Sequence, residues 1–125
     1  MVYSDGTLLG EVTTDADGSF TLNLYPGTYY LVVERDYYLD AAQTGIVVEV
    51  GTTITLPTVT LLGGDSNDSD TINILDLALQ GSHYGLNEGD PGWSPAADIN
   101  GDGTVNILDL TISGSNFGKS SPVPW

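Results

Sequence analysis

The sequence has no cysteine, a single histidine and only two basic residues, Arg35 and Lys119, against 17 acidic ones. The absence of cysteine excludes disulfides and leaves the redox compartment open. The net charge of −15 disfavours nucleic acid and anionic lipid as partners, because like charges repel, and it favours a cation. Without a Gly-x-Ser-x-Gly motif or a histidine-based group of reactive side chains, we expect no enzyme.

Long hydrophobic runs are also missing. No stretch approaches the roughly 18 apolar residues of a membrane span, and the Met1–Asp5 start lacks the basic and apolar regions of a signal peptide. We therefore expect a soluble chain without a membrane anchor. A length of 125 residues suits one ordinary domain or two very small ones, and two small domains need extra stabilisation, for example by a metal.

The first half of the chain, residues 1 to about 62, is rich in Thr, Val, Tyr and Leu between turn-forming residues. Five runs are predicted as strands: residues 7–14, 19–24, 28–34, 45–50 and 53–61. The first two flank Asp17-Gly18, a strong hairpin signal. Strands at this spacing, with no helical period between them, predict a small antiparallel β-sandwich.

Two groups of side chains in this half allow alternative interpretations. Asp15 and Asp17 could bind a metal, but Asp-x-Asp-Gly between strands is ordinary tight-turn chemistry, and we favour the turn. Tyrosines at 29, 30, 37 and 38 could stack on a sugar, but aromatic residues in a sheet more often pack against each other.

The second half contains an internal repeat. "DSNDSDTINILDL" from Asp65 aligns without a gap with "DINGDGTVNILDL" from Asp98, and nine of fifteen residues are identical between Thr71–Gly85 and Thr104–Gly118. In the second copy, oxygen donors fall at loop positions one, three, five, seven, nine and twelve, with Gly103 at position six for a sharp turn. This spacing is that of an EF-hand-type loop and predicts calcium, although magnesium is the simpler alternative cation. The ligands are Asp98, Asn100, Asp102, Thr104 through its carbonyl, Asn106 and Asp109.

The first copy keeps most of this pattern. Ser69 replaces the acid at position five and Asp70 replaces the glycine at position six, where an aspartate tolerates a positive φ. We predict a second calcium ion here, bound more weakly than at the Asp98 loop because one carboxylate is lost. Its ligands are Asp65, Asn67, Ser69, Thr71, Asn73 and Asp76.

Each loop runs into a short helix, and we expect the two helices to end at Gly85 and Gly118. Gly81 and Gly114 occupy the same place in both copies, which predicts that the helices approach closely there. The sequence leaves open whether the C-terminal "KSSPVPW" is a free tail or folds back, with Trp125 and Trp93 at the ends of the unit.

The residues also carry two family resemblances. "TTDADGSFTLNLYPGTYYLVVE" resembles the carboxypeptidase-regulatory-like β-sandwich over residues 2 to about 61, which implies an immunoglobulin- or prealbumin-like fold. Such domains begin a strand or more earlier than Val2, so we expect either a fragment or an open sheet edge that accepts a strand. The two calcium loops, each leading into a helix, resemble a dockerin over residues 63 to about 118.

The order of the two units resembles an X-module–dockerin pair, with domains expected at residues 1–62 and 63–125. The resemblance implies an extracellular, calcium-dependent module that docks a larger protein onto a cohesin domain. Dockerins face the cohesin with loop positions ten and eleven, which here are Ile74-Leu75 and Ile107-Leu108. These pairs could instead fill the space between the helices, but a two-helix unit cannot bury every apolar face, and we favour the interface.

A second function is also compatible with the sequence. The open sheet edge could accept a strand from another copy, which would make the chain a self-assembling extracellular structural subunit. The two hypotheses differ in whether the chain stays monomeric in the presence of calcium.

Overall fold

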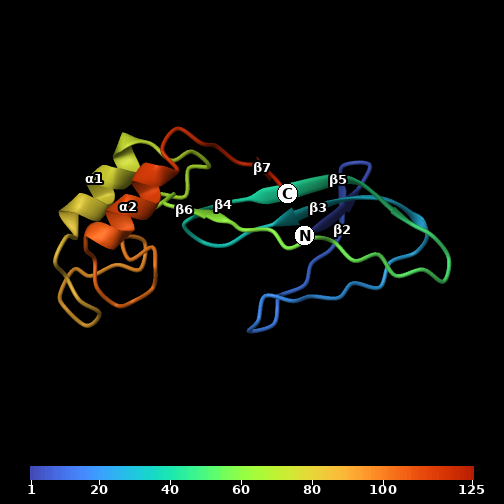
Figure 1. The fold of residues 1–125 in the computed structure, drawn as a ribbon, viewed down its shortest axis with the longest axis horizontal. Coiled ribbons are helices and arrows are strands. Elements are labelled where there is room, and N and C mark those ends of the chain that lie inside the picture. Colours follow the sequence, from blue (N-terminus) through green and yellow to red (C-terminus); the bar gives the residue numbers. More distant parts are fainter.

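A computed structural model describes residues 1–125. The molecule is elongated, with a β-sheet unit at one end and two helices at the other (Figure 1). Neither helix has the length and apolar character that a membrane crossing requires. This arrangement agrees with the predicted fold class, an antiparallel β-sandwich followed by a helical unit with two loop–helix repeats.

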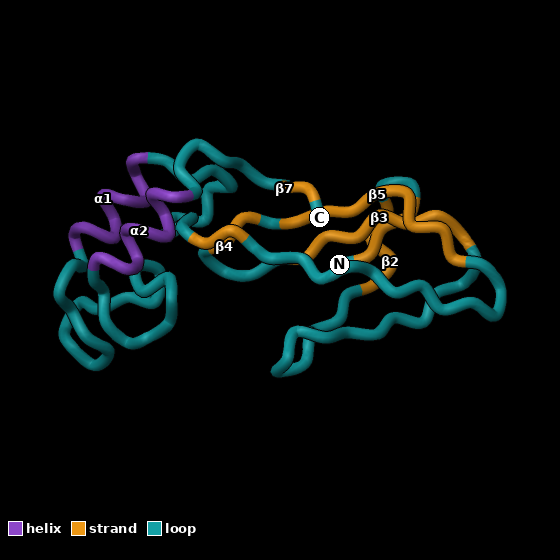
Figure 2. Tube along the Cα trace, in the orientation of Figure 1, coloured by secondary structure: helices purple, strands orange, loops and turns teal.

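The main sheet has five strands in the order β2-β1-β3-β5-β7. All of its pairs are antiparallel except β5–β7, which is parallel. Figure 2 shows the strands together with the long loops that lie beside them. The strands are β1 (Val2–Ser4), β2 (Thr7–Gly10), β3 (Gly27–Val33), β5 (Ala41–Val48) and β7 (Val123–Pro124).

The core of this unit forms on one face of the sheet. Val2, Tyr29 and Leu31 are buried there. Side chains from two extended segments, which supply the second layer, pack against these three residues. They include Phe20, Leu22, Leu24 and Leu56. Phe20, Leu22 and Leu24 alternate with the period of two that a strand would show, so all three side chains reach the core.

Several predicted strands differ from the observed ones. Residues 19–24 and 53–61 form no strand, residues 7–14 shorten to β2, and β5 begins four residues before the predicted Gly45. The turn at Asp17-Gly18 does form, because Gly18 N donates to Asp15 O at 2.9 Å and Ser19 N to Asp17 Oδ1 at 2.9 Å. The flanking segments pack through side chains without a ladder of backbone bonds, which composition and alternation cannot foresee.

The helical unit contains α1 (Ile74–Ser82) and α2 (Ile107–Ser115). Asn73 and Asn106 are the N-caps, and each forms a capping box with the aspartate three residues later. The predicted ends at Gly85 and Gly118 were wrong by three residues. The C-caps are His83 and Asn116, and the two glycines end the following turn at φ +85° and +83°.

A two-stranded sheet of β4 (Tyr38–Leu39) and β6 (Leu62–Gly63) joins the two units. The Tyr38 hydroxyl donates to Ile99 O at 2.8 Å, so a side chain of the first unit contacts the second loop. A Cβ on Gly63 would lie 2.9 Å from atoms of both Ile99 and Tyr38, which explains the need for glycine at this crowded point. The units therefore meet in direct, close contact.

The C-terminal segment is not a free tail. It returns from α2 to the sheet and forms β7 beside β5 (Figure 1). Trp125 lies edge-on to Phe20, with 6.4 Å between ring centroids, and its Nε1 donates to Pro57 O at 2.7 Å. The fold-back therefore ends on the core of the β-sheet unit.

Candidate functional site

The second loop is organised around two buried carboxylates, Asp98 and Asp109. Asp98 accepts backbone N–H bonds from Gly101 and Asp102 at 3.0 and 3.2 Å, and from Gly103 at 2.8 Å. Asp109 reaches back from the first turn of α2 and accepts from Asn100 N at 3.2 Å and Asn106 N at 2.8 Å. Positions one and twelve thus hold the loop closed from its two ends.

The first loop repeats this geometry with Asp65 and Asp76, both buried. Asp65 accepts from Ser69 N at 2.9 Å and Asp70 N at 2.7 Å, and Asp76 accepts from Asn67 N and Asn73 N at 3.1 and 2.8 Å. Asp70 has φ +64°, so the prediction that aspartate can take the turn position of Gly103 is confirmed.

Positions seven and nine of each loop bond to each other and to the first turn of the following helix. The Thr71 and Thr104 carbonyls each accept from the asparagine side chain at position nine, at 3.3 Å. The Oδ1 atoms of Asn73 and Asn106 accept from Leu75 N and Leu108 N at 2.8 Å and so cap the helices. One lone pair of each oxygen is therefore already used, which fits position nine of such loops, where the contact to the ion often runs through water.

Asp102 is the one predicted carboxylate ligand that is not buried. It is exposed and accepts from Asn100 Nδ2 at 3.0 Å and Thr104 N at 2.9 Å. No three carboxylate or imidazole side chains come together closely enough to form a metal centre on their own. Each loop instead combines two buried carboxylates with amide, hydroxyl and backbone oxygens.

The chemistry of these donors fits calcium. Four carboxylates are buried in the two loops, and burying an anion is costly unless a positive charge or hydrogen bonds compensate for it. The two basic residues lie elsewhere, because Arg35 stacks over the Tyr38 ring at 4.3 Å and Lys119 Nζ donates to Asn116 Oδ1. Backbone N–H groups compensate for part of this cost, and a hard divalent cation with all-oxygen ligands would supply the neutralising charge. Calcium accepts this mixed set of ligands.

The apolar pairs at loop positions ten and eleven are on the surface. Ile74, Leu75, Ile107 and Leu108 are 55–65% exposed, so the alternative that they fill the space between the helices is wrong. The rest of the exposed helix faces is small and uncharged: Ala78, Gly81 and Ser82 on α1, and Thr111, Gly114 and Ser115 on α2.

Gly81 and Gly114 do not mark a close approach of the helices, contrary to the prediction. A Cβ at either position would meet nothing within 4 Å. Both glycines lie on the outer surface, where they keep the helix face smooth beside the apolar pairs. In a chain of net charge −15, these two helix faces form a neutral surface that a protein partner could cover.

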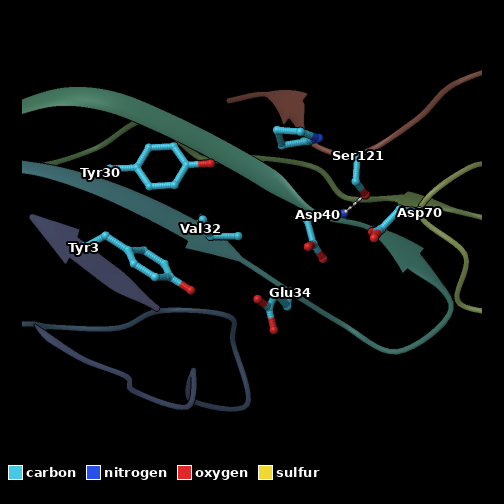
Figure 3. Close-up of a pocket in the computed structure, with 8 residues that line it drawn as sticks. Tyr3, Tyr30, Val32, Glu34, Asp40, Asp70 and Ser121 are labelled. Atoms are coloured by element: carbon cyan, nitrogen blue, oxygen red, sulfur yellow. Dashed lines mark hydrogen bonds between the residues drawn. The ribbon is translucent and has the colours of Figure 1, made fainter. Parts of the chain in front are cut away.

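A hollow of about 300 Å³ lies where the sheet meets the first loop. Tyr3 and Tyr30 line one side of it, and Glu34, Asp40 and Asp70 the other (Figure 3). Burial, and after it the negative charges of Glu34, Asp70, Asp68 and Asp65, together raise the pKa of Asp40 to about 6.

Asp40 predicts a pH dependence of stability. Because its pKa is higher in the folded chain than in the unfolded one, the folded state binds more protons between pH 4 and 6, and the free energy of unfolding falls as pH rises through this window. We expect Asp40→Asn to be more stable than the parent above pH 6 and equal to it below pH 4. The gain is less than about 1 kcal/mol because the carboxyl is partly solvated. Urea unfolding at pH 4, 5, 6 and 7 measures this.

The exposed Glu49 provides the control for this measurement. Glu49→Gln removes the same charge far from the hollow and should keep the parent's slope between pH 4 and 6. An Asp40→Asn variant with an unchanged slope would contradict the assignment.

Several residues around the loops were missed by the sequence analysis. Gln80 is buried between the helices, where its Nε2 donates to Ser66 Oγ at 2.7 Å and to Ser113 Oγ. Thr71 and Thr104 bond to Ser120 and Asn87 across two β-bridges. The repeat itself carried a usable signal, because the offset of 33 residues that aligns Asp65 with Asp98 also aligns Asn87 with Ser120.

Comparison with known protein families divides the chain in two. Residues 2–62 match the family model of the carboxypeptidase regulatory-like domain, and residues 63–113 match that of the dockerin type I domain. No curated protein matches the chain in sequence.

Solved structures share the whole fold. The chain is similar to an N-terminal interface mutant of a type II cohesin–X-dockerin complex from Acetivibrio cellulolyticus, with a TM-score of 0.81 and 23% identity over 96% of this chain and 81% of that one. A C-terminal interface mutant of the type II complex from the same organism gives a TM-score of 0.76 and 23% identity, over 86% of this chain and 74% of that one. At this identity the likeness establishes the arrangement of the fold.

Proposed function

Because the chain joins a carboxypeptidase regulatory-like domain to a dockerin domain, we propose that it is a non-catalytic docking module that binds a cohesin domain when its loops hold calcium. In this proposal residues 1–62 and 63–125 are its two domains, and the module tethers a larger extracellular protein to a cellulosome-like assembly. The observation that carries the proposal is the repeated unit itself: a loop closed by two buried aspartates leads directly to an exposed Ile-Leu pair.

Calcium has a structural role in this proposal. Each loop would hold one ion through the oxygens at positions one, three, five, seven, nine and twelve, and the Asp65 loop, with Ser69 at position five, would bind more weakly. The ion would fix the first turn of the helix because the aspartate at position twelve is both a ligand and part of the capping box. The apolar pair on that turn would then be presented in one orientation.

The exposed Ile-Leu pairs and the uncharged helix faces around them indicate which kind of cohesin surface would fit. A cohesin that covers Ile74-Leu75 or Ile107-Leu108 needs an apolar surface of its own, since the helix faces around these pairs carry no charge. Residues 63–113 match the dockerin type I family model, but the apolar Ile-Leu pairs resemble those of type II or other non-clostridial dockerins more than the polar Ser-Thr pair common in type I. We therefore test a type II cohesin first.

Self-association is the second candidate, and the edge strand β2 favours it. All four residues of Thr7–Gly10 are exposed, including Leu8 and Leu9, and the strand pairs only with β1. A free, apolar edge of this kind can accept a strand from another copy. The two candidates predict different particle sizes in the presence of calcium.

We expect calcium removal to separate the two candidates. In calcium, size-exclusion chromatography with light scattering should give a compact monomer that binds a type II cohesin in titration calorimetry. In chelator, the buried carboxylates of the loops repel one another, so the helical unit should become less stable, expand without unfolding and release the cohesin. Calcium-driven growth into large species, with no cohesin binding, would support the self-associating subunit instead.

A further inference from the structure

Each loop is held from outside by the segment that follows the helix of the other repeat. Gly118 N donates to Ile72 O at 2.8 Å, and Ile72 N donates to Lys119 O at 3.0 Å. The equivalent bonds of the other repeat run from Gly85 N to Val105 O at 2.8 Å and from Val105 N to Leu86 O at 2.9 Å. The two repeats thus close each other through a pair of short antiparallel ladders.

The ladders continue to positions six and seven of the loops. In the first loop, Ser121 N donates to Asp70 O at 2.9 Å, and the Thr71 and Ser120 hydroxyls bond at 2.9 Å. In the second loop, Glu88 N donates to Gly103 O at 2.8 Å, and Thr104 Oγ1 donates to Asn87 Oδ1 at 2.9 Å. These bonds fix the backbone that carries the position-seven carbonyl, a predicted calcium ligand.

The symmetry ends after these bonds. Beyond Glu88 the chain turns back within the helical unit, where Asn87 N donates to Asp90 Oδ2 at 2.8 Å. Beyond Ser121 the chain crosses to the β-sheet unit, as the red segment of Figure 1 shows. The first loop is therefore the one whose outer ladder is continuous with the sheet.

The crossing segment is bonded along its length. Ser121 Oγ accepts from Asp40 N at 2.9 Å, a bond drawn in Figure 3, and Val123 N donates to Asp40 O at 2.8 Å. Trp125 N donates to Ala42 O at 3.1 Å, while its indole packs on Phe20 and bonds to Pro57 O. These bonds follow one another along the segment as it leaves the loop, and Trp125 anchors its far end on the sheet.

We propose that Lys119–Trp125 is a strap that positions the first calcium loop, so that docking of Trp125 on the sheet and calcium binding at the Asp65 loop favour each other. The inference rests on the calcium sites of the proposed function. A docked strap fixes the backbone of Asp70 and Thr71 before calcium binds. The entropy cost of ordering these residues then no longer lowers the calcium affinity. The strap would therefore raise the calcium affinity of the loop that is predicted to bind more weakly, because Ser69 replaces an acid at its position five.

The test is a calcium titration of the full chain followed by NMR, with the Asp70 and Gly103 amides as separate reporters of the two loops. Both amides donate to the position-one aspartate of their own loop. In Trp125→Ala we expect the calcium affinity of the Asp65 loop to fall about five- to tenfold, at the lower end of ordinary coupling between sites. The calcium affinity of the Asp98 loop should change by less than about twofold, because the strap can influence that loop only indirectly, through the rest of the helical unit.

Two further variants keep the test decisive. Tyr25→Ala removes an aromatic side chain that is 88% exposed and away from the strap, and it should change neither affinity. Ser121→Ala removes the bond to Asp40 N without touching the indole, and it should weaken the Asp65 loop in the same direction by a smaller factor.

Each of the following results would overturn the proposal. If both loops bind calcium and Trp125→Ala changes neither affinity, the strap is only packing. If the affinities of both loops fall equally in Trp125→Ala and Ser121→Ala, the variants destabilise the whole unit. If the parent chain binds no calcium at either loop, the proposed function fails together with the strap, and the missing response in the parent distinguishes this case.

Discussion

In chelator, Asp109→Ala is expected to lower the stability of the helical unit by about 1 to 3 kcal/mol, because it leaves two partly buried N–H donors, those of Asn100 and Asn106, without their acceptor. In calcium, the same variant should lose binding at the second loop, since position twelve supplies the ligand that closes the cage. Urea unfolding with and without calcium measures the first effect, and titration calorimetry measures the second.

Asp102→Ala is the matched comparison for this prediction. Asp102 is a predicted ligand of the same loop, but it is exposed and lies outside the capping box. Its removal should weaken calcium binding while leaving the stability in chelator within about 0.5 kcal/mol of the parent. If Asp109→Ala in chelator also stayed within about 0.5 kcal/mol of the parent, the buried aspartate would have no structural role before the ion binds.

The second large effect is expected on cohesin binding. A variant with aspartate at Ile74, Leu75, Ile107 and Leu108 should bind at least about a thousandfold more weakly, because it removes both apolar anchors and forces charges into a dry interface. The fold should be unchanged, since all four side chains are exposed. Calorimetry against a type II cohesin gives the affinity, and circular dichroism confirms the fold.

The two half-variants test whether the repeats are interchangeable. If the module can bind in two orientations related by rotation, Ile74→Asp with Leu75→Asp, or Ile107→Asp with Leu108→Asp, should cost only about a factor of two, the loss of one of two equivalent states. If either half-variant abolishes binding alone, a single orientation is used. The contact of Tyr38 with Ile99 makes the surroundings of the two pairs unequal and gives such an outcome a structural reason.

The loops and helices could be predicted from the sequence because the interactions that form them are local. The helix after each loop and the turn at Asp70 depend on contacts within a dozen residues, and the structure agrees with both predictions. The N-cap role of Asn73 and Asn106 is equally local but was not predicted. The pairing of strands is different. Phe20 and Leu24 have the right alternation, but whether their backbones join a ladder depends on neighbours far along the chain. The ligand roles of the loop oxygens and the partner role of the Ile-Leu pairs stay predictions.

The C-terminal segment could not be predicted for the same reason. "KSSPVPW" has no periodicity, and the partners of Ser121 and Trp125 lie 81 and 68 residues away in sequence. Only the repeat hinted at its role, by aligning Ser120 with Asn87. Long-range bonds of this kind, like the buried Gln80–Ser113 contact, appear only when the chain is folded.

The reciprocal ladders have a consequence for the origin of the helical unit. A peptide with only one repeat contains a loop and a helix, but the segment that would close its loop belongs to the other repeat. Such a peptide could satisfy its exposed backbone groups by pairing with an identical copy about a two-fold axis. A symmetric dimer of single repeats is therefore the simplest precursor of this geometry, and gene duplication with a covalent link would convert it into one chain whose halves were free to diverge.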